Sequence, residues 1–347
     1  MTTLARPPAP IVIGHRGAPG YRPEHTLASY RLALALGVDA VEPDLVVTRD
    51  GVLVVRHENE ISATTDVALH PELADRRTTK VVAGREVTGW FTEDLTLAEL
   101  KTLRCVERLP DLRPGNRRYD GRWPVATFDE LLLLVAEEGR RRGRPVGVHV
   151  ELKTPSYFAG LGLPLEEAVL AALRDHGLDR PGSGAVVQSF ETAALRSLRV
   201  HTALPLVQLI DSVGAPADCV ATGDPTTHAD LASARGLRMV AGYADLVGVH
   251  RDLVRPRDPA TGRTADTTTL VDDAHLAGLR VLVWTLRAEN RHLPAELRNG
   301  AAPGAHGDAR AEARAFLEAG VDGVFSDHPD LALSAREDWL LDAALAV

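Results

Sequence analysis

The chain has 347 residues, of which 45% are hydrophobic and 25% are charged. This composition is ordinary for a globular protein and excludes a disordered chain, a collagen-like repeat and a bundle of membrane helices. The net charge is −9, which argues against nucleic-acid binding as the main task because phosphate neutralisation needs a basic surface. The length suits either two domains or one large barrel.

The cysteine spacing and the lack of a targeting signal are consistent with a water-soluble protein in a reducing compartment. Cys105 and Cys219 lie far apart, without the spacing of a metal site or a disulfide framework. The amino terminus has no signal-peptide pattern, and no apolar run approaches the roughly 20 residues that a membrane span needs. We therefore expect a cytoplasmic protein without stable membrane insertion, and export by an unrecognised route stays open.

Short apolar runs rich in β-branched residues predict eight strands. They are residues 11–14, 40–46, 52–55, 146–151, 185–189, 206–210, 279–285 and 323–326. Amphipathic segments between most of them predict helices, several of which end at a glycine. They are residues 26–36, 127–142, 165–176, 192–201, 230–236, 268–278 and 308–320. This alternation is typical of a parallel sheet covered on both sides, and a closed (β/α)8 TIM barrel fits it best.

Two intervals break the alternation. Residues 61–122 are rich in Arg, Thr, Asp and Pro, contain one helix signal at 96–103, and are too long for an ordinary loop. We interpret them as a small insertion after the third predicted strand, over the carboxyl face of a single TIM-barrel domain that spans 1–347. The insertion is either a lid or an excursion without contact to a ligand. A second irregular stretch, 290–307, follows the seventh predicted strand on the same side.

Polar side chains gather where the predicted strands end, which is where a TIM barrel carries its active site. They are His15, Arg16, Glu42, Asp44, His57, Glu151, Lys153, Gln188 and Trp284. Glu42 and Asp44 are two positions apart, so both side chains point to one face of a strand. With Glu151 they make three carboxylates that are costly to bury without a cation. Such a set suits one divalent cation, Ca²⁺ or Mg²⁺, whereas a salt-bridged strand end is the alternative interpretation.

The two histidines and two cations could act on a phosphate. His15 and His57 titrate near neutral pH, so one could take a proton from a nucleophile while the other donates one to a leaving group. Structural hydrogen bonding is the alternative role for a histidine at a strand end. Arg16 offers a planar fork to phosphate oxygens, and Lys153 adds a point charge beside the carboxylates. A salt bridge from Arg16 to Glu24 is compatible with that role.

Four motifs follow one another near the amino terminus: HRG at 15–17, PEHT at 23–26, EPD at 42–44 and DGVLVVRHE at 50–58. They resemble the opening of the glycerophosphodiester phosphodiesterase family, whose pattern is HRG, P-E-N-T, E-x-D and D-G-x-x-V-x-x-H-D. Later blocks agree in order. They are ATTDVA at 63–68, TLAELKTL at 96–103, VATFDELL at 125–132, VELK at 150–153, VVQSF at 186–190, VWTLRAEN at 283–290 and DGVFSDHP at 322–329. The match spans nearly the whole chain, and its length and insertion resemble the longer bacterial members.

The resemblance implies a metal-dependent enzyme that hydrolyses glycerophosphodiesters to sn-glycerol 3-phosphate and an alcohol. Small molecules such as glycerophosphocholine and glycerophosphoethanolamine are the implied substrates. The implied acid–base pair is His15 and His57, and the implied ligands of the divalent cation are Glu42, Asp44 and Glu151. The implied phosphate- and substrate-binding residues are Arg16, Lys153, Gln188, Phe190 and Trp284, with Glu24 in support. The nucleophile is either the glycerol 2-hydroxyl, which gives a cyclic phosphate, or water.

Several positions depart from the family pattern without removing a principal role. His25 replaces an asparagine, Glu58 replaces an aspartate, and Ser326 and His328 alter a T-D-x-P ending. These changes concern the surroundings of Glu24 and the rim of the pocket, and therefore the substrate. Two alternative functions remain. A phospholipase D-like enzyme acting on lysophospholipids predicts an exposed apolar or basic rim, and a non-catalytic phosphodiester-binding barrel predicts the loss of an acid, a base or a metal ligand.

Overall fold

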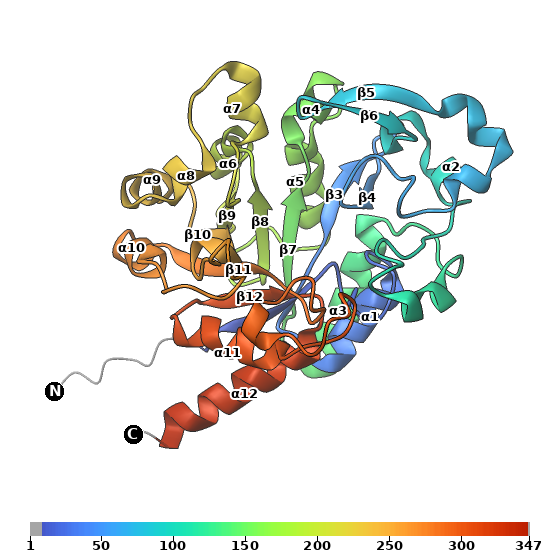
Figure 1. Ribbon diagram of the computed structural model, residues 1–347. Helices are drawn as coiled ribbons and strands as arrows, with labels where there is room; N and C mark the ends of the chain where they lie inside the picture. Colours follow the sequence, from blue (N-terminus) through green and yellow to red (C-terminus); the bar gives the residue numbers. More distant parts are fainter. Residues whose placement is uncertain (1–8, 346–347) are drawn as a thin grey trace.

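A closed ring of parallel strands organises the computed structural model, which describes residues 9–345 (Figure 1). Its eight strands are β1 (Ile11–His15), β2 (Ala40–Glu42) continued by β3 (Asp44–Val47), β7 (Gly147–Leu152), β8 (Ala185–Ser189), β9 (Leu206–Ile210), β10 (Leu246–His250), β11 (Arg280–Leu286) and β12 (Gly323–Ser326). β1 pairs with β12 on one side and with β2 on the other, which closes the ring. The predicted TIM barrel is confirmed. Residues 1–8, which contribute to the signal-peptide expectation, lie outside the described residues.

Helices follow most of the barrel strands. They are α1 (Leu27–Leu36), α2 (Leu97–Leu100), α3 (Phe128–Arg142), α4 (Pro155–Gly160), α5 (Leu165–Asp175), α6 (Thr192–Arg199), α7 (Ala217–Thr222), α8 (His228–Ala232), α9 (Ala234–Val240), α10 (Leu270–Leu276), α11 (Ala309–Glu318) and α12 (Pro329–Leu345). α3 begins at a capping box of Thr127 and Glu130 and ends at Gly143, whose φ is 65°. The helix predicted at 230–236 is divided into α8 and α9, because extended Ser233 ends one helix and caps the next.

The third predicted strand forms, but it lies outside the barrel. Residues 52–55 become β4 (Leu53–Val55), which pairs antiparallel with β3. Only Asp44 and Leu45 of β3 pair with β7, so the rest of β3 extends past the end of β7 and pairs with β4. β4 then returns the chain to the rim, where the Arg56 N–H donates to the Asp44 carbonyl at 3.0 Å. The 61–122 segment therefore follows a hairpin attached to the second barrel strand.

The barrel strand that sequence reasoning missed is β10. Its sequence, LVGVH, has Gly248 at the centre, and an interior glycine weakens a strand signal. Close packing favours glycine there, because a Cβ atom would lie 2.6 Å from the Leu209 Cδ2 atom, which would have to move. The Gly248 carbonyl also accepts a hydrogen bond from the Trp284 indole at 2.9 Å. Side chains, not a channel, fill the interior: Ile13, Ala40, Val186, Val207, Leu209, Leu246, Leu282 and Phe325 form one buried cluster.

Residues 61–122 form short elements of their own, which lie beside the β3–β4 hairpin in Figure 1. They are η1 (Val67–Leu69), η2 (Pro71–Arg76), β5 (Thr78–Val82), β6 (Arg85–Gly89), η3 (Thr92–Asp94), α2 and η4 (Pro114–Tyr119). β5 and β6 pair as a separate antiparallel hairpin. Two further 3-10 helices, η5 (Arg251–Leu253) and η6 (Ala295–Leu297), flank the barrel rim. No helix within residues 9–345 is long and apolar enough to cross a membrane.

Candidate active site

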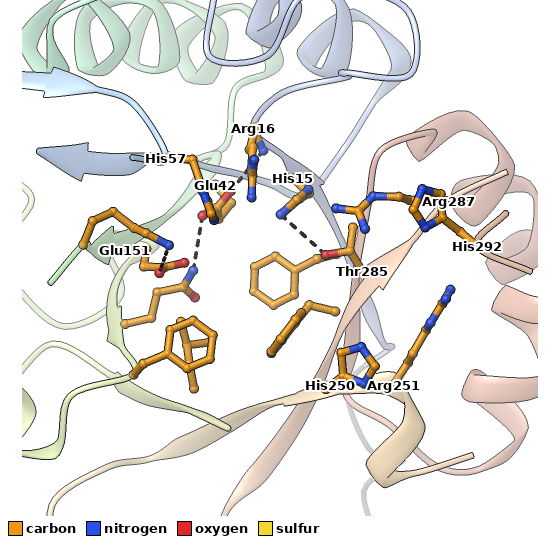
Figure 2. A pocket seen from close by; sticks show the side chains of 16 residues that line it. His15, Arg16, Glu42, His57, Glu151, His250, Arg251, Thr285, Arg287 and His292 are labelled. Carbon is orange, nitrogen blue, oxygen red and sulfur yellow. Dashed lines mark hydrogen bonds and ion pairs between the residues drawn. The ribbon is translucent and has the colours of Figure 1, made fainter. Parts of the chain in front are cut away.

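The carboxyl ends of the strands surround a pocket whose open space, including its mouth, is about 710 Å³ (Figure 2). Nine residues singled out in the sequence line it: His15, Arg16, Glu42, His57, Glu151, Lys153, Gln188, Phe190 and Trp284. Two others, Asp44 and Glu24, lie behind this lining and form ion pairs with Arg16. The barrel therefore gathers the predicted site residues in one place.

Three buried carboxylates form one edge of the pocket. Oxygen atoms of Glu42, Asp44 and Glu151 lie within 4.8 Å of one another, and each residue is at most 7% exposed. Burial, followed by repulsion from the neighbouring carboxylates, raises the pKa of Glu42 well above its usual range. Burial also raises the pKa of Glu151, to about 8. Within the described part of the chain, the Asp44 Oδ1 atom has no hydrogen-bond partner. An all-oxygen set with these properties fits a hard divalent cation.

Two cations adjoin this carboxylate cluster. The Lys153 Nζ atom lies 2.6 Å from Glu151 Oε1 and 3.7 Å from Asp44 Oδ1. Arg16 donates from Nη1 to Glu24 Oε2 at 3.0 Å, and its Nε atom lies 3.3 Å from Asp44 Oδ2. Burial alone would raise the pKa of Asp44, but these cations outweigh it and lower that pKa well below its usual range. The cluster thus combines two carboxyl groups whose ionisation is disfavoured, Glu42 and Glu151, with one that is kept ionised, Asp44.

The departure at position 25 places a histidine against the cluster. His25 is fully buried, with a φ of 56°, in the left-handed region that histidine and asparagine enter more readily than most residues. Its Nε2 atom lies 2.9 Å from Asp44 Oδ2, and its Nδ1 atom lies 2.8 Å from the Tyr30 hydroxyl oxygen. An ionised carboxylate only accepts hydrogen bonds, so His25 donates to Asp44 and orients it.

His15 and His57 both line the pocket, and each has a carboxylate on its Nδ1 atom. The His15 Nδ1 atom lies 2.6 Å from Asp327 Oδ1, and the His57 Nδ1 atom bonds to Glu58. Because carboxylates accept, each Nδ1 carries the proton and each Nε2 keeps its lone pair. Burial and then Arg16 lower the pKa of His15 to about 4 and that of His57 to about 3. Both rings are therefore neutral at pH 7.

Aromatic side chains line the pocket beside the carboxylates. The Phe190 and Trp284 rings meet edge to face, with centroids 5.6 Å apart. The Lys153 Nζ atom lies 5.8 Å from the centroid of the Phe190 ring. Gln188 extends from β8 and donates from Nε2 to Glu42 Oε1 at 3.5 Å. The pocket thus offers an apolar surface next to its charged edge, which suits a small molecule with a carbon backbone and polar substituents.

Several pocket residues escaped sequence reasoning. Across the pocket from Glu151, the wall consists of His250, Arg251, Thr285, Arg287 and His292 (Figure 2). Arg287 directly follows β11, and Asp327 directly follows β12, so the strand-end rule that singled out His15 could have found both. His250 and Arg251 lie at the end of β10, which was not predicted, and no rule pointed to them.

Comparisons with known proteins agree with this geometry. Residues 15–331 match the model of the Glycerophosphoryl diester phosphodiesterase family. A glycerophosphodiester phosphodiesterase of Arabidopsis thaliana is 32% identical over 332 residues, which cover 92% of this chain and 83% of that protein. A glycerophosphodiester phosphodiesterase of Haemophilus influenzae is 28% identical over 344 residues, which cover 92% of this chain and 88% of that protein.

Solved structures share the fold. A crystal structure from Silicibacter pomeroyi, assigned by name to the same family, has a TM-score of 0.66 at 26% identity and covers 96% of this chain and 95% of its own. An Oleispira antarctica phosphodiesterase in complex with the product sn-glycerol-3-phosphate has a TM-score of 0.61 at 22% identity. That alignment covers 95% of this chain and 97% of the other.

Proposed function

The chain belongs to the glycerophosphoryl diester phosphodiesterase family, and we propose that its pocket hydrolyses glycerophosphodiesters such as glycerophosphocholine and glycerophosphoethanolamine. The protein is an enzyme, a glycerophosphodiester phosphodiesterase; the proposal concerns its substrates, its cation and its residues. The products are sn-glycerol 3-phosphate and an alcohol, and a neighbour with the same fold binds that phosphate product. One observation carries the proposal: two neutral histidines line a single pocket together with Arg16 and a buried carboxylate cluster.

Arg16 and Lys153 bind the phosphodiester. Arg16 is held from behind by Glu24 and Asp44, which fixes the plane of its guanidinium group. Lys153 adds a compact charge at the border between the carboxylate cluster and Phe190. These two cations create local positive potential in a chain whose net charge is −9.

His15 and His57 divide the proton transfers. With Nδ1 protonated, either ring can take a proton on Nε2 from the nucleophile. The other ring needs a proton to donate to the departing alkoxide. Burial is the main cause of the lowered pKa of both histidines, and the charge of Arg16 is the second; an anionic phosphodiester bound beside Arg16 offsets this second cause and so favours protonation. The reaction therefore needs no permanently charged histidine.

The glycerol end of the substrate packs against Trp284 and Phe190, next to the carboxylate cluster. Glu42, Asp44 and Glu151 would hold one divalent cation, Ca²⁺ or Mg²⁺. When bound, that cation supplies Lewis-acid stabilisation to the phosphate oxygens. Gln188 keeps Glu42 oriented through its amide. Together these contacts favour a diester with glycerol at this end of the pocket over a diester with a bulkier alcohol there.

The test is a substrate panel with and without a chelator. Purified enzyme is incubated with glycerophosphocholine, glycerophosphoethanolamine and a lysophospholipid, and released glycerol 3-phosphate is measured by a coupled assay, with head-group release followed in parallel. We expect release from the two water-soluble diesters, loss of activity in EDTA, and recovery with Ca²⁺ or Mg²⁺. Turnover of the lysophospholipid alone, or full activity in EDTA, would overturn the proposal.

A further inference from the structure

Each proposed catalytic histidine is the first of three side chains linked by hydrogen bonds: the histidine, a carboxylate and an arginine. Behind His15 lies Asp327, whose Oδ2 atom accepts a hydrogen bond from Arg113 Nη2 at 2.5 Å. Arg113 also donates from Nε to Glu289 Oε1 at 2.5 Å, and its residue exposure is only 7%. Arg113 belongs to the 61–122 segment, none of whose side chains is among those lining the pocket.

The second chain has the same order. Behind His57 lies Glu58, whose Oε1 atom accepts a hydrogen bond from Arg108 Nη1 at 3.0 Å, and Arg108 Nη2 contacts the other oxygen. Arg108 also donates two hydrogen bonds of 2.7 Å to Glu24, the carboxylate that holds Arg16. Arg108 and Arg113 are five positions apart and lie on one turn of the chain. They thus bind the two carboxylates that orient His15 and His57.

That turn is tied to the barrel at several points. The Arg113 N–H donates to the Leu109 carbonyl at 2.8 Å, which closes the loop between the two arginines. Asn116 donates to the Pro19 carbonyl at 3.0 Å, in the connection that follows β1 and His15. On the other side, a Cβ atom on Gly304 would lie 2.8 Å from the Leu112 carbonyl oxygen. The turn is therefore a fixed part of the rim in this structure.

We propose that Arg108 and Arg113 are positioning residues for the phosphodiesterase reaction, and that the turn of the 61–122 segment that carries them is thereby part of the catalytic apparatus. The inference rests on the proposed acid–base roles of His15 and His57. Neither arginine touches the reacting atoms in this scheme. Each acts by holding the carboxylate that fixes the tautomer and the ring orientation of one histidine.

The physical basis is the state of the supporting carboxylates. Burial would raise the pKa of Asp327, but Arg287 and Arg113 outweigh it and keep that pKa well below its usual range. Burial likewise opposes ionisation of Glu58, whereas hydrogen bonds to His57 and Arg108 lower its pKa. An ionised, immobile acceptor holds the proton on Nδ1. Without Arg113, Asp327 keeps a single arginine partner, Arg287, whose Nε atom donates to Oδ2 at 2.8 Å. Without Arg108, Glu58 keeps no arginine partner among the described residues. Each carboxylate is then held less firmly, and so is the direction of its histidine.

Arg108→Gln and Arg113→Gln test the inference, with Arg113→Lys as the conservative variant and Lys80→Gln as the matched control. Lys80 lies in the same segment and pairs with Glu93 at 3.0 Å and with Asp94 at 2.7 Å, not with either histidine or its supporting carboxylate. For Arg113→Gln we expect kcat on glycerophosphocholine to fall about 10- to 100-fold, as for lost supports of catalytic groups elsewhere, while KM changes little. Arg113→Lys should recover part of the loss. Arg108→Gln should lower kcat and also raise KM, because Glu24 links it to Arg16.

A second substrate separates positioning from a general structural defect. The p-nitrophenyl diester of sn-glycerol 3-phosphate releases an anion that needs no proton, so it does not depend on the general acid. We expect one of the two Gln variants, the one whose histidine is the acid, to lose much less on this diester than on glycerophosphocholine. The other variant should lose the same on both. The ratio of the two activities is independent of how much of a variant is folded.

The outcomes are distinct from failure of the proposed function. If wild-type enzyme hydrolyses neither diester, the proposed function is wrong. If wild-type enzyme is active and both Gln variants retain its kcat, the positioning role is wrong. Equal losses on both diesters in both variants, or a similar loss in Lys80→Gln, would also overturn it, because they indicate destabilisation of the segment. Asymmetric losses, partial recovery with lysine and a silent control support it.

Discussion

Replacing Glu151 by glutamine measures how much free energy of unfolding the protein loses by burying this ionisable carboxylate. In the metal-free folded protein, burial is the main cause that raises the pKa of this carboxyl from 4.5 to about 8. A raised pKa in the folded state contributes stability that is complete below pH 4.5 and lost as the pH rises through 8. Glutamine has nearly the same shape but does not titrate, so Glu151→Gln should remove this dependence.

The size of this destabilisation follows from the shift in the pKa of Glu151. Between about pH 6.5 and pH 8, one such group costs the metal-free protein about 2 kcal/mol. This window avoids the buried histidines, whose lowered pKa values change stability only below their unfolded value of about 6.5. At the usual entropy of unfolding per residue, 2 kcal/mol in a chain of 347 residues corresponds to a Tm decrease of about 3 °C.

Differential scanning calorimetry in EDTA is the appropriate assay. Wild-type Tm should fall by about 3 °C more than that of Glu151→Gln between the two pH values, because the titrating groups outside the carboxylate cluster are shared by both proteins. Millimolar Mg²⁺ or Ca²⁺ should raise the wild-type Tm, and more so at pH 8, since cation binding must displace the proton. Parallel curves for the two metal-free proteins, or equal stabilisation of both by the cation, would refute the reasoning.

Four other substitutions have expected outcomes. His15→Ala and His57→Ala should each lower kcat by about 10²- to 10⁴-fold with the circular dichroism spectrum unchanged; a near-normal rate with the cation present would show that the ring is dispensable. Trp284→Ala should raise KM for glycerophosphocholine several-fold in steady-state kinetics, because an apolar pocket surface is lost, and an unchanged KM would place the glycerol elsewhere. Gly248→Ala should destabilise the barrel by about 1–3 kcal/mol in urea unfolding, since its Cβ would lie 2.6 Å from Leu209 Cδ2, and an unchanged midpoint would show that the barrel relaxes there.

Much of the barrel was predictable because its strands are buried on both faces. Seven of its strands were predicted from continuous apolar runs, and together they determine the fold. The two errors in the barrel have different origins. β4 has the composition of a barrel strand, and only its antiparallel pairing with β3 reveals a hairpin. β10 is a barrel strand whose apolar run is interrupted by Gly248, where a Cβ atom would press against the Leu209 side chain.

The pocket lining was predictable where strand ends carry unusual residues. His57 illustrates the limit, because it reaches the pocket from a hairpin and not from the end of a barrel strand. Arg108 and Arg113 lie in a segment without regular periodicity, rich in arginines that a single sequence cannot rank. Their partners, Glu58 and Asp327, are adjacent to other motifs, but the pairing depends on tertiary structure alone.

The hydrogen bond between His15 and Asp327 joins residues 312 positions apart, across the seam where β1 meets β12. During synthesis the first of these residues leaves the ribosome near the beginning of translation, and the second leaves near the end. A growing chain that has not yet reached β12 therefore contains all three carboxylates but lacks the partner that orients His15. Activity should consequently switch on only when the ring closes, which makes turnover a direct report of completed folding in pulse-labelled or truncated chains.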